Sequence, residues 1–283
     1  MSLSVLTLVR GRREHLVNLI AGLNASTKAP DELVIAYMQD EEHADLPATA
    51  FPIRTVMVPG EPMPLAAARN RAAEAASGDT LVFLDVDCIP SPTLVARYAE
   101  TAGQGVHLGE VLYLPAGATE GGLDFDRLDR LGQRHPAKPA IASDEIRATP
   151  NHGELWGLSF ALSAADWRAA GGMDERYVGY GAEETDFAAR LEAANVPMAW
   201  VGGARAYHQH HAVHVPPYQH FDAILRNATL FRATWGRWCM DYWLGQFADR
   251  GMIRIDDDRI TVLRHPGADE ITASRMPDTT LFS

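Results

Sequence analysis

The sequence contains only two cysteines, Cys88 and Cys239, among 283 residues. Two cysteines are too few for a disulfide framework or a thiolate metal cluster, so we expect two reduced thiols in a cytoplasmic protein. No apolar run is long enough to span a bilayer. The first residues have no basic region or cleavage site before a strand-like segment begins, so we expect no secretory leader.

Positive charge is also scarce. The chain has 25 lysines and arginines against 37 acidic residues, which gives a formal net charge of −12. A general nucleic-acid binder needs a basic surface for the phosphate backbone, so we expect no nucleic-acid partner. A local basic pocket for a diphosphate remains compatible with this charge. The 47% hydrophobic and 22% charged residues are typical of a globular protein with a buried core.

Short apolar segments alternate with helical ones along the first third of the chain. A proline opens the helical segment at residues 64–76 and Ser77-Gly78 follows it, as expected for helix ends. Residues 80–84 are entirely apolar, which is typical of a strand inside a parallel sheet. This alternation predicts an open, doubly wound α/β sheet. The strand-like segments are residues 3–9, 33–37, 53–58 and 80–84.

The second half of the chain is less regular. Residues 115–151 are rich in glycine, proline and charge without a clear period, so we expect a long surface excursion that acts as a lid or binding loop. A strand at 198–201 follows a helix at about 183–194. Residues 215–249 are aromatic-rich and helical in pattern, and the tail beyond residue 254 is weakly patterned.

The strand at 80–84 ends in Asp85-Val86-Asp87. Ligands of parallel α/β sheets bind outside the carboxyl ends of the strands. Two carboxylates there suit a hard divalent cation that also contacts a substrate's phosphates. The alternative is that both residues only form a turn before Pro90, since aspartate is common at strand ends.

A second acidic group follows glycines at Gly179-Tyr180-Gly181-Ala182 and comprises Glu183, Glu184 and Asp186. Acids in a first helical turn are stabilised by the helix dipole, which accounts for one or two of them. Glu184, however, shares its helix face with Phe187 and Leu191. A carboxylate on such a face needs a partner, or it opens into a cleft where its altered pKa suits a general base.

Three histidines follow the strand at 198–201, namely His208, His210 and His211. Imidazole binds divalent transition metals, so one of them is expected to complete a metal site. We expect this to be His208, with the other two as alternatives. The competing interpretation is that one histidine caps a carbonyl group and the others are solvated.

These segments, in this order, resemble family 2 glycosyltransferases with the GT-A fold, an open mixed Rossmann-like sheet flanked by helices. The resemblance is to the galactosyltransferase-like branch, which carries Gly-Trp-Gly-Gly-Glu-Asp before its catalytic helix. It covers about residues 3 to 211. The matching segments are Ser4-Val5-Leu6-Thr7-Leu8, Leu65-Ala66-Ala67-Ala68-Arg69-Asn70-Arg71, residues 78–87, Gly171-Gly172-Met173-Asp174-Glu175, residues 179–186 and Ala206-Tyr207-His208.

The resemblance implies the following roles. Glu184 falls where the family places its catalytic base, and Glu183 and Asp186 would hold acceptor hydroxyls or order the loop. Asp87 would bind Mn²⁺ or Mg²⁺ together with His208, and Asp85 would contact the metal or the donor's ribose. Arg69 and Arg10 would contact the nucleoside-diphosphate sugar, which is expected to be UDP-linked.

The sequence departs from the family at three positions. The second strand of these enzymes commonly ends in an aspartate that recognises the base, but here the chain reads Ala36-Tyr37-Met38-Gln39-Asp40. Tyr37 or Gln39 would substitute for it, or Asp40 would reach in. The base is Glu184 in place of the usual aspartate, and Tyr180 replaces the usual tryptophan.

The expected activity is therefore metal-dependent, inverting transfer of a sugar to a hydroxyl of a glycan or small-molecule acceptor. Two other classes remain open: a sugar-phosphate nucleotidyltransferase, for which Arg10-Gly11-Arg12-Arg13 offers a faint phosphate loop, and a non-catalytic nucleotide-sugar-binding module.

We expect a GT-A domain at residues 1–214, with a donor-binding half (1–105) and an acceptor or catalytic half (106–214), and a C-terminal helical extension at 215–283. The extension carries an aromatic stripe that predicts core packing or a homodimer face. Peripheral membrane contact is a weaker alternative, because Arg226, Arg232 and Arg237 give little positive charge. The stripe consists of Leu225, Phe231, Trp235, Trp238, Trp243 and Phe247.

Overall fold

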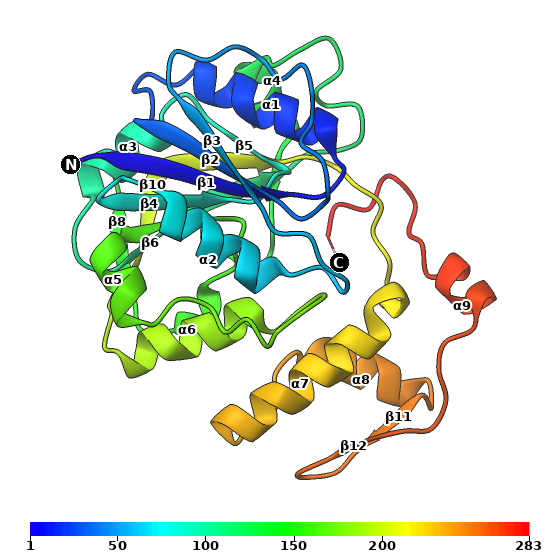
Figure 1. The fold of residues 1–283 in the computed structure, drawn as a ribbon. Coiled ribbons are helices and arrows are strands. Elements are labelled where there is room, and N and C mark those ends of the chain that lie inside the picture. Colours follow the sequence, from blue (N-terminus) through cyan, green and yellow to red (C-terminus); the bar gives the residue numbers. More distant parts are fainter. Residues whose placement is uncertain (283) are drawn as a thin grey trace.

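The computed structural model describes residues 1–282 and has one large mixed sheet with helices on both faces (Figure 1). The strands lie in the order β3-β2-β1-β4-β9-β6-β10-β5, with β7 paired to β6 and β8 to β10. The strands are β1 (Leu3–Val9), β2 (Glu32–Tyr37), β3 (Ile53–Met57), β4 (Thr80–Leu84), β5 (Cys88–Pro90), β6 (Val106–Tyr113), β7 (Gln133–Arg134), β8 (Ile146–Thr149), β9 (Ser159–Ser163) and β10 (Met198–His208).

The first half of the sheet is parallel and the second half is mixed. β1 pairs in parallel with β2 and β4, and β3 continues the parallel set beyond β2. β9 runs antiparallel to both β4 and β6, and β10 is parallel to β6. β4 and β10 therefore point the same way, so the residues that follow them emerge at the same edge. The predicted α/β fold class is confirmed.

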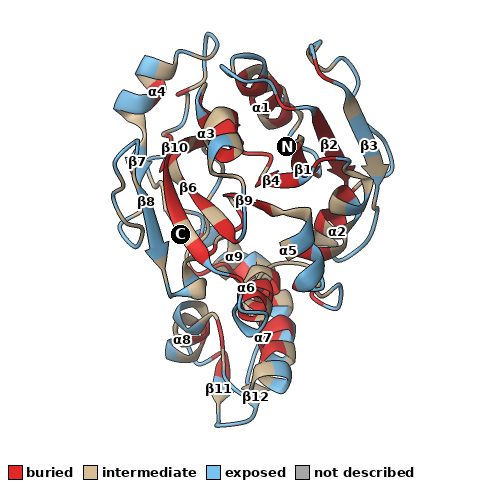
Figure 2. Ribbon diagram, turned by 90° about the vertical axis from the view of Figure 1, so that its left-hand side faces the viewer, coloured by how far each residue is buried: buried red, intermediate tan, exposed pale blue. Residues whose placement is uncertain are grey.

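Helices cover the two faces of the sheet. α1 (Arg13–Asn24) and α3 (Leu94–Thr101) pack on one face, and α2 (Leu65–Ala75), α5 (Ala164–Ala169) and α6 (Glu183–Ala193) pack on the other. Alternate residues of β1 enter the two cores, as the period of a strand requires: Leu6 and Leu8 face α2, and Val5 and Val9 face α1. The central strands β1, β2 and β4 are buried from both sides, whereas β3, β7 and β8 are exposed or only partly buried (Figure 2).

The excursion at residues 115–151 is more structured than its composition predicts. It contains α4 (Phe125–Leu131), β7 and β8, and the one-turn helix η1 (His152–Glu154) follows it. Asp124 begins α4 by accepting a hydrogen bond from the Arg127 backbone. These elements are short and two of them extend the main sheet, so their stability comes from tertiary pairing and leaves little periodic signal in the sequence.

Residues 215–282 form an extension with a core of its own, and it is not entirely helical. Its helices are η2 (Tyr218–His220), α7 (Phe221–Trp235), α8 (Asp241–Asp249) and α9 (Ala268–Ala273), and β11 (Ile253–Ile255) and β12 (Ile260–Val262) form a small antiparallel sheet. The segment at 215–249, predicted to be helical, contains η2 and the two helices α7 and α8. The chain then turns back toward the main domain (Figure 1). The backbone N–H of Met276 donates to the Val213 carbonyl, and that of Val215 donates to the Ser274 carbonyl.

The aromatic stripe of the extension packs inside the chain. Phe231 and Phe247 are fully buried, and the three tryptophans of the stripe are partly buried against the same core. Core packing therefore accounts for the stripe, and the side chains expected to form a dimer face are largely enclosed. None of the helices in the described part of the chain has the length and apolar character needed to cross a membrane.

Candidate active site

The two predicted acidic groups meet at the carboxyl edge of the sheet, and Arg69 joins them. Arg69 lies on α2 and is 2% exposed. Its Nη2 donates to Asp85 Oδ1 at 3.1 Å and to Glu184 Oε1 at 2.8 Å. Its Nη1 lies 3.5 Å from Glu183 Oε1. Three carboxylates from two distant segments thus share one buried guanidinium.

The pKa values of two of these carboxyl groups are shifted from their ordinary values. Burial raises the pKa of Asp85 to about 7, with Arg69 opposing the shift and Asp87 adding to it. Burial and the neighbouring charge of Glu184 likewise raise the pKa of Glu183 to about 7, against the opposing effect of Arg69. One cation does not neutralise one buried and two partly buried carboxylates, so part of the cluster takes up a proton near neutral pH. Such perturbed groups are typical of functional sites.

Arg69 was expected to contact the donor, and that contact stays a prediction. Its guanidinium lies beneath the carboxylates, and among the described residues it contacts them rather than an open surface. Its observed role is to hold Asp85 and Glu184 in place. A buried guanidinium suits that task because its planar donors bind carboxylates in fixed directions.

Gly157 makes the close packing of this cluster possible. A Cβ at this position would lie 2.0 Å from Glu184 Oε1 and 2.8 Å from Arg69 Nη2. No side chain fits there without displacing Glu184. Residue 157 belongs to the segment between η1 and β9, far from Glu184 in sequence, and no local pattern singles it out.

A second cluster lies beside the first and consists of Asp87, His208 and His211. Asp87 follows β4 and His208 ends β10, so the edge shared by these strands brings them together. The Nε2 atoms of His208 and His211 lie 3.5 Å and 3.7 Å from the two carboxylate oxygens of Asp87. The ligand atoms of the three residues are all within 4.8 Å of one another. Asp87 and His208 are buried, and His211 is half-buried.

The chemistry of this cluster fits a divalent cation. Burial lowers the pKa of His208 to about 4, so its imidazole is neutral and free to bind a metal at neutral pH. Burial alone would raise the pKa of Asp87, but neighbouring positive charge holds it below its usual value. His208 contributes most to this lowering of the Asp87 pKa, followed by Arg12, whose guanidinium contacts Asp87 Oδ2. A cationic group therefore already lies against the predicted metal ligand.

The ligand set differs from the prediction in two respects. Asp85, predicted as a ligand or a donor contact, faces Arg69 and is absent from this three-residue cluster. His211, predicted as an alternative to His208, belongs to the cluster together with Asp87 and His208. His210 does not belong to the cluster; its backbone carbonyl lies 3.4 Å from His15 Nε2.

The residues expected to bind the donor lie at the ends of β1 and β2. Arg10 is exposed and pairs with Glu61. Gln39 accepts from the Gly11 backbone at 2.7 Å and donates to the Glu41 carbonyl, so its amide ties two loops together. Tyr37 is fully buried in the core of this structure, and its contact with a base stays a prediction.

Asp186 was predicted to hold an acceptor hydroxyl or to order the loop. It is fully buried, and its oxygens accept from Tyr177, from Arg190 at 2.6 Å and from the Trp235 indole at 2.8 Å. These partners leave no free face for an acceptor hydroxyl in this structure. Asp186 therefore orders the segment that leads into α6 and ties that helix to α7.

The extension also holds the loop that precedes Glu184. Asn227 of α7 is fully buried, and its amide donates to the carbonyls of Val178, Tyr180 and Gly181, the last at 2.8 Å. A Cβ on Gly181 would lie 2.6 Å from the Met240 sulfur. The loop is thus pressed against the extension, a contact that sequence patterns do not reveal.

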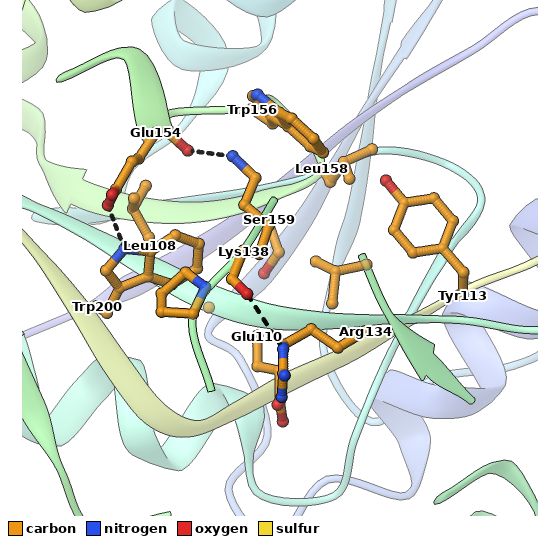
Figure 3. A pocket seen from close by; sticks show the side chains of 13 residues that line it. Leu108, Glu110, Tyr113, Arg134, Lys138, Glu154, Trp156, Leu158, Ser159 and Trp200 are labelled. Atoms are coloured by element: carbon orange, nitrogen blue, oxygen red, sulfur yellow. Dashed lines mark hydrogen bonds between the residues drawn. The ribbon is translucent and has the colours of Figure 1, made fainter. Parts of the chain in front are cut away.

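A small pocket beside the site is lined by residues of the excursion (Figure 3). The Lys138 ammonium lies 3.4 Å from the Trp156 ring centroid and donates to the Glu154 carbonyl at 2.8 Å. Burial lowers the pKa of Lys138 to about 7. Tyr113, on the same pocket, stacks on His208 with centroids 4.7 Å apart. The pocket therefore adjoins the metal cluster through Tyr113, the last residue of β6.

Two protein-family sequence models, both of glycosyltransferases, match the chain. Residues 4–141 match the sequence model of glycosyl transferase family 2, and residues 137–214 match that of the N-terminal domain of galactosyltransferase. Residues 4–141 thus form a glycosyl transferase family 2 domain. The two matched ranges together run from the first strand through the histidine cluster, which is the stretch over which the motifs resemble the family.

Curated relatives match part of the chain. Two validoxylamine A glucosyltransferases, from Streptomyces hygroscopicus subsp. jinggangensis and subsp. limoneus, are each 30% identical over 153 residues, covering 47% of this chain. The match covers 36% and 34% of those proteins, so the chain spans about a third of their length.

Solved structures show the same GT-A fold. The crystal structure of S. aureus TarS 1–349 has a TM-score of 0.54 at 13% identity, covering 89% of this chain and 72% of that one. GalNAc-T7, crystallised with UDP, GalNAc and Mn²⁺, has a TM-score of 0.55 at 16% identity, covering 89% and 51%. TarS 1–349 in complex with UDP gives 0.53 at 14% identity, covering 89% and 72%.

Proposed function

We propose that this family 2 protein transfers a sugar from a nucleoside-diphosphate sugar, with UDP as the nucleotide, to an acceptor hydroxyl, in a metal-dependent and inverting reaction. The observation that carries the proposal is the convergence of Glu184 and Asp85 on Arg69, next to the cluster of Asp87, His208 and His211. UDP in the TarS and GalNAc-T7 structures supports the choice of nucleotide.

Asp87, His208 and His211 would hold the metal. A bound divalent ion supplies positive charge that stabilises a departing diphosphate. Imidazole ligands disfavour Mg²⁺, which prefers oxygen, so Mn²⁺ fits this set better of the two predicted ions. The presence of Mn²⁺ in the GalNAc-T7 structure agrees with this choice.

Glu184 is the proposed general base. Its Oε1 accepts from Arg69, so we assign proton transfer to Oε2. The acceptor hydroxyl gives its proton to Oε2 while its oxygen forms a bond to the anomeric carbon, and the bond from that carbon to the diphosphate breaks on the opposite face. The configuration of the sugar is then inverted. Arg69 and Gly157 fix Glu184 in the orientation that this transfer requires.

Donor turnover with and without metal tests the proposal. Purified protein is incubated with UDP-glucose, UDP-galactose or UDP-N-acetylglucosamine and Mn²⁺, and UDP release is measured. We expect release with at least one donor and its loss in excess chelator, with recovery on adding Mn²⁺. Release of pyrophosphate from a nucleoside triphosphate and a sugar 1-phosphate would indicate a nucleotidyltransferase instead. Donor binding without any turnover would indicate a binding module. A cytoplasmic location remains a prediction.

A further inference from the structure

Lysine is rare in this chain, and one of its two lysines contacts the segment that packs against the proposed general base. The two are Lys28 and Lys138, and the other basic residues are arginines. We propose that Lys138 is a positioning residue for Glu184, which it keeps in place by holding residues 154–157. The proposal rests on the proposed function, since it names a further residue that serves the same reaction.

The Lys138 ammonium contacts two residues of one short segment. Its Nζ donates to the Glu154 carbonyl at 2.8 Å and lies 3.4 Å from the centroid of the Trp156 ring, so it stands between them (Figure 3). A cation over the face of a ring is attracted to it electrostatically, and more strongly where water is partly excluded. Lys138 is half-buried. One side chain of the excursion therefore fixes a carbonyl and a ring two residues apart.

This segment packs directly against Glu184. Gly157 is its last residue, and a Cβ there would lie 2.0 Å from Glu184 Oε1, so the glycine backbone and the carboxylate are in close contact. Leu155 is 3% exposed and belongs to the core cluster that includes the apolar residues of α6. Because closely packed groups transmit small displacements to their neighbours, a shift of residues 154–157 also moves the Glu184 carboxylate.

Lys138 makes these contacts without an ion pair to any carboxylate among residues 1–282. Burial lowers the pKa of Lys138 to about 7, and the charges of Glu154 and Glu184 oppose this shift. The other charged or titratable groups that face it are Arg134, whose Nε donates to the Lys138 carbonyl at 3.1 Å, and His135, whose pKa is lowered by burial and then by Lys138. The ammonium is thus partly withdrawn from water and held by a carbonyl and a ring, which suits a role in fixing that segment.

Steady-state kinetics with Mn²⁺ and the UDP-sugar that the wild type uses test the proposal. Measurements at about pH 6, below the pKa of Lys138, keep its ammonium form predominant. Lys138→Met retains a side chain of similar length but removes the charge and the donor. We expect kcat to fall about tenfold, because a small misplacement of a catalytic group lowers the rate steeply. The donor KM and UDP binding should stay as in the wild type. Lys138→Arg should restore kcat to within about threefold of the wild type, since it returns a cation and a donor to the ring face.

Hydrogen exchange tests the same link without turnover, because amide exchange reports local opening of the backbone. In Lys138→Met, exchange should become faster both at residues 154–158 and at residues 183–186, where α6 begins. In Lys138→Arg, both segments should exchange as in the wild type. Faster exchange at residues 154–158 alone would overturn the link to Glu184.

Lys28→Met is the matched control, because Lys28 is the other lysine of the chain and is exposed in the loop after α1. It should change neither the kinetics nor the exchange. The proposal is overturned if Lys138→Met keeps the kcat of the wild type or if Lys138→Arg is as slow as Lys138→Met. Weaker UDP binding by Lys138→Met would also overturn it, since this would indicate direct contact with the donor. Absence of wild-type turnover together with the expected exchange pattern would contradict the proposed function but retain the link.

Discussion

Arg69 Nη2 lies 2.8 Å from Glu184 Oε1 and 3.1 Å from Asp85 Oδ1, so a single buried nitrogen connects the two acidic groups of the site. Arg69→Met should destabilise the protein by about 3–5 kcal/mol, because it leaves buried carboxylates without their cation. Arg69→Lys should recover part of the stability but little activity, since an ammonium does not reproduce the planar donors. Chemical denaturation and UDP release measure the two effects. Wild-type activity in the lysine variant would contradict the positioning role.

The raised pKa of Glu183 predicts a specific pH dependence of stability. The folded pKa is about 7 against an ordinary value of 4.5, so the folded state binds the proton more tightly than the unfolded state does. The contribution of this proton to stability is complete below about pH 4.5 and is lost as the pH rises through 7. Glu183→Gln should flatten this part of the profile.

Denaturation curves between pH 5 and 8 measure the effect of Glu183. The control is Glu74→Gln, because Glu74 is a surface residue of α2 that pairs only with Arg71. The stability of the Glu74→Gln variant should depend on pH as that of the wild type does. A Glu183→Gln profile that still falls as steeply as the wild type between these pH values would show that other groups cause the dependence.

Gly157→Ala should remove activity while the protein stays folded. The new Cβ would lie 2.0 Å from Glu184 Oε1, so the carboxylate has to leave its position on Arg69. We expect donor turnover to fall by about 100-fold, the lower end of what a positioned general base contributes. Gly245→Ala on α8 is the control, because its Cβ would meet no atom within 4 Å. Equal turnover in both variants would exclude the proposed crowding of Glu184.

The contact between α7 and the loop before Glu184 predicts the effect of Asn227 variants. Asn227→Ala removes three donated hydrogen bonds and should cost about 1–3 kcal/mol. Asn227→Asp should be worse, because a carboxylate would face three carbonyl oxygens. Thr229→Val is a control, since the Thr229 hydroxyl bonds only within its own helix, to Leu225. Hydrogen exchange of residues 178–186 should rise in the Asn227 variants alone.

The sequence predicted the parts of the site that follow from strand ends. Asp87 follows the apolar strand β4 and His208 ends β10, and strands that point the same way bring such residues to one edge. Glu184 was predictable because an acid on an apolar helix face needs a special environment. Arg69 was recognised as a site residue, but its contact with the carboxylates rather than with the donor depends on burial, which the sequence does not display.

Other parts of the site depend on contacts between distant segments. Gly157 and Asn227 lie in regions without a functional motif, and only packing brings them to Glu184 and its loop. Tyr37 ends a strand at this edge, but its ring packs in the core with α1, a burial that the sequence alone does not display. The short strands β7 and β8 were missed because pairing with β6 and β10 stabilises them.

Donor turnover and UDP binding by Glu184→Gln, measured with Mn²⁺ and compared with Asp87→Asn, test the central claim that the two clusters serve one donor in separate roles. The account predicts that Glu184→Gln loses turnover by about 100-fold or more yet binds UDP as the wild type does. Asp87→Asn should lose metal-dependent UDP binding as well as turnover. Wild-type turnover by Glu184→Gln, or undiminished metal-dependent binding by Asp87→Asn, would contradict it.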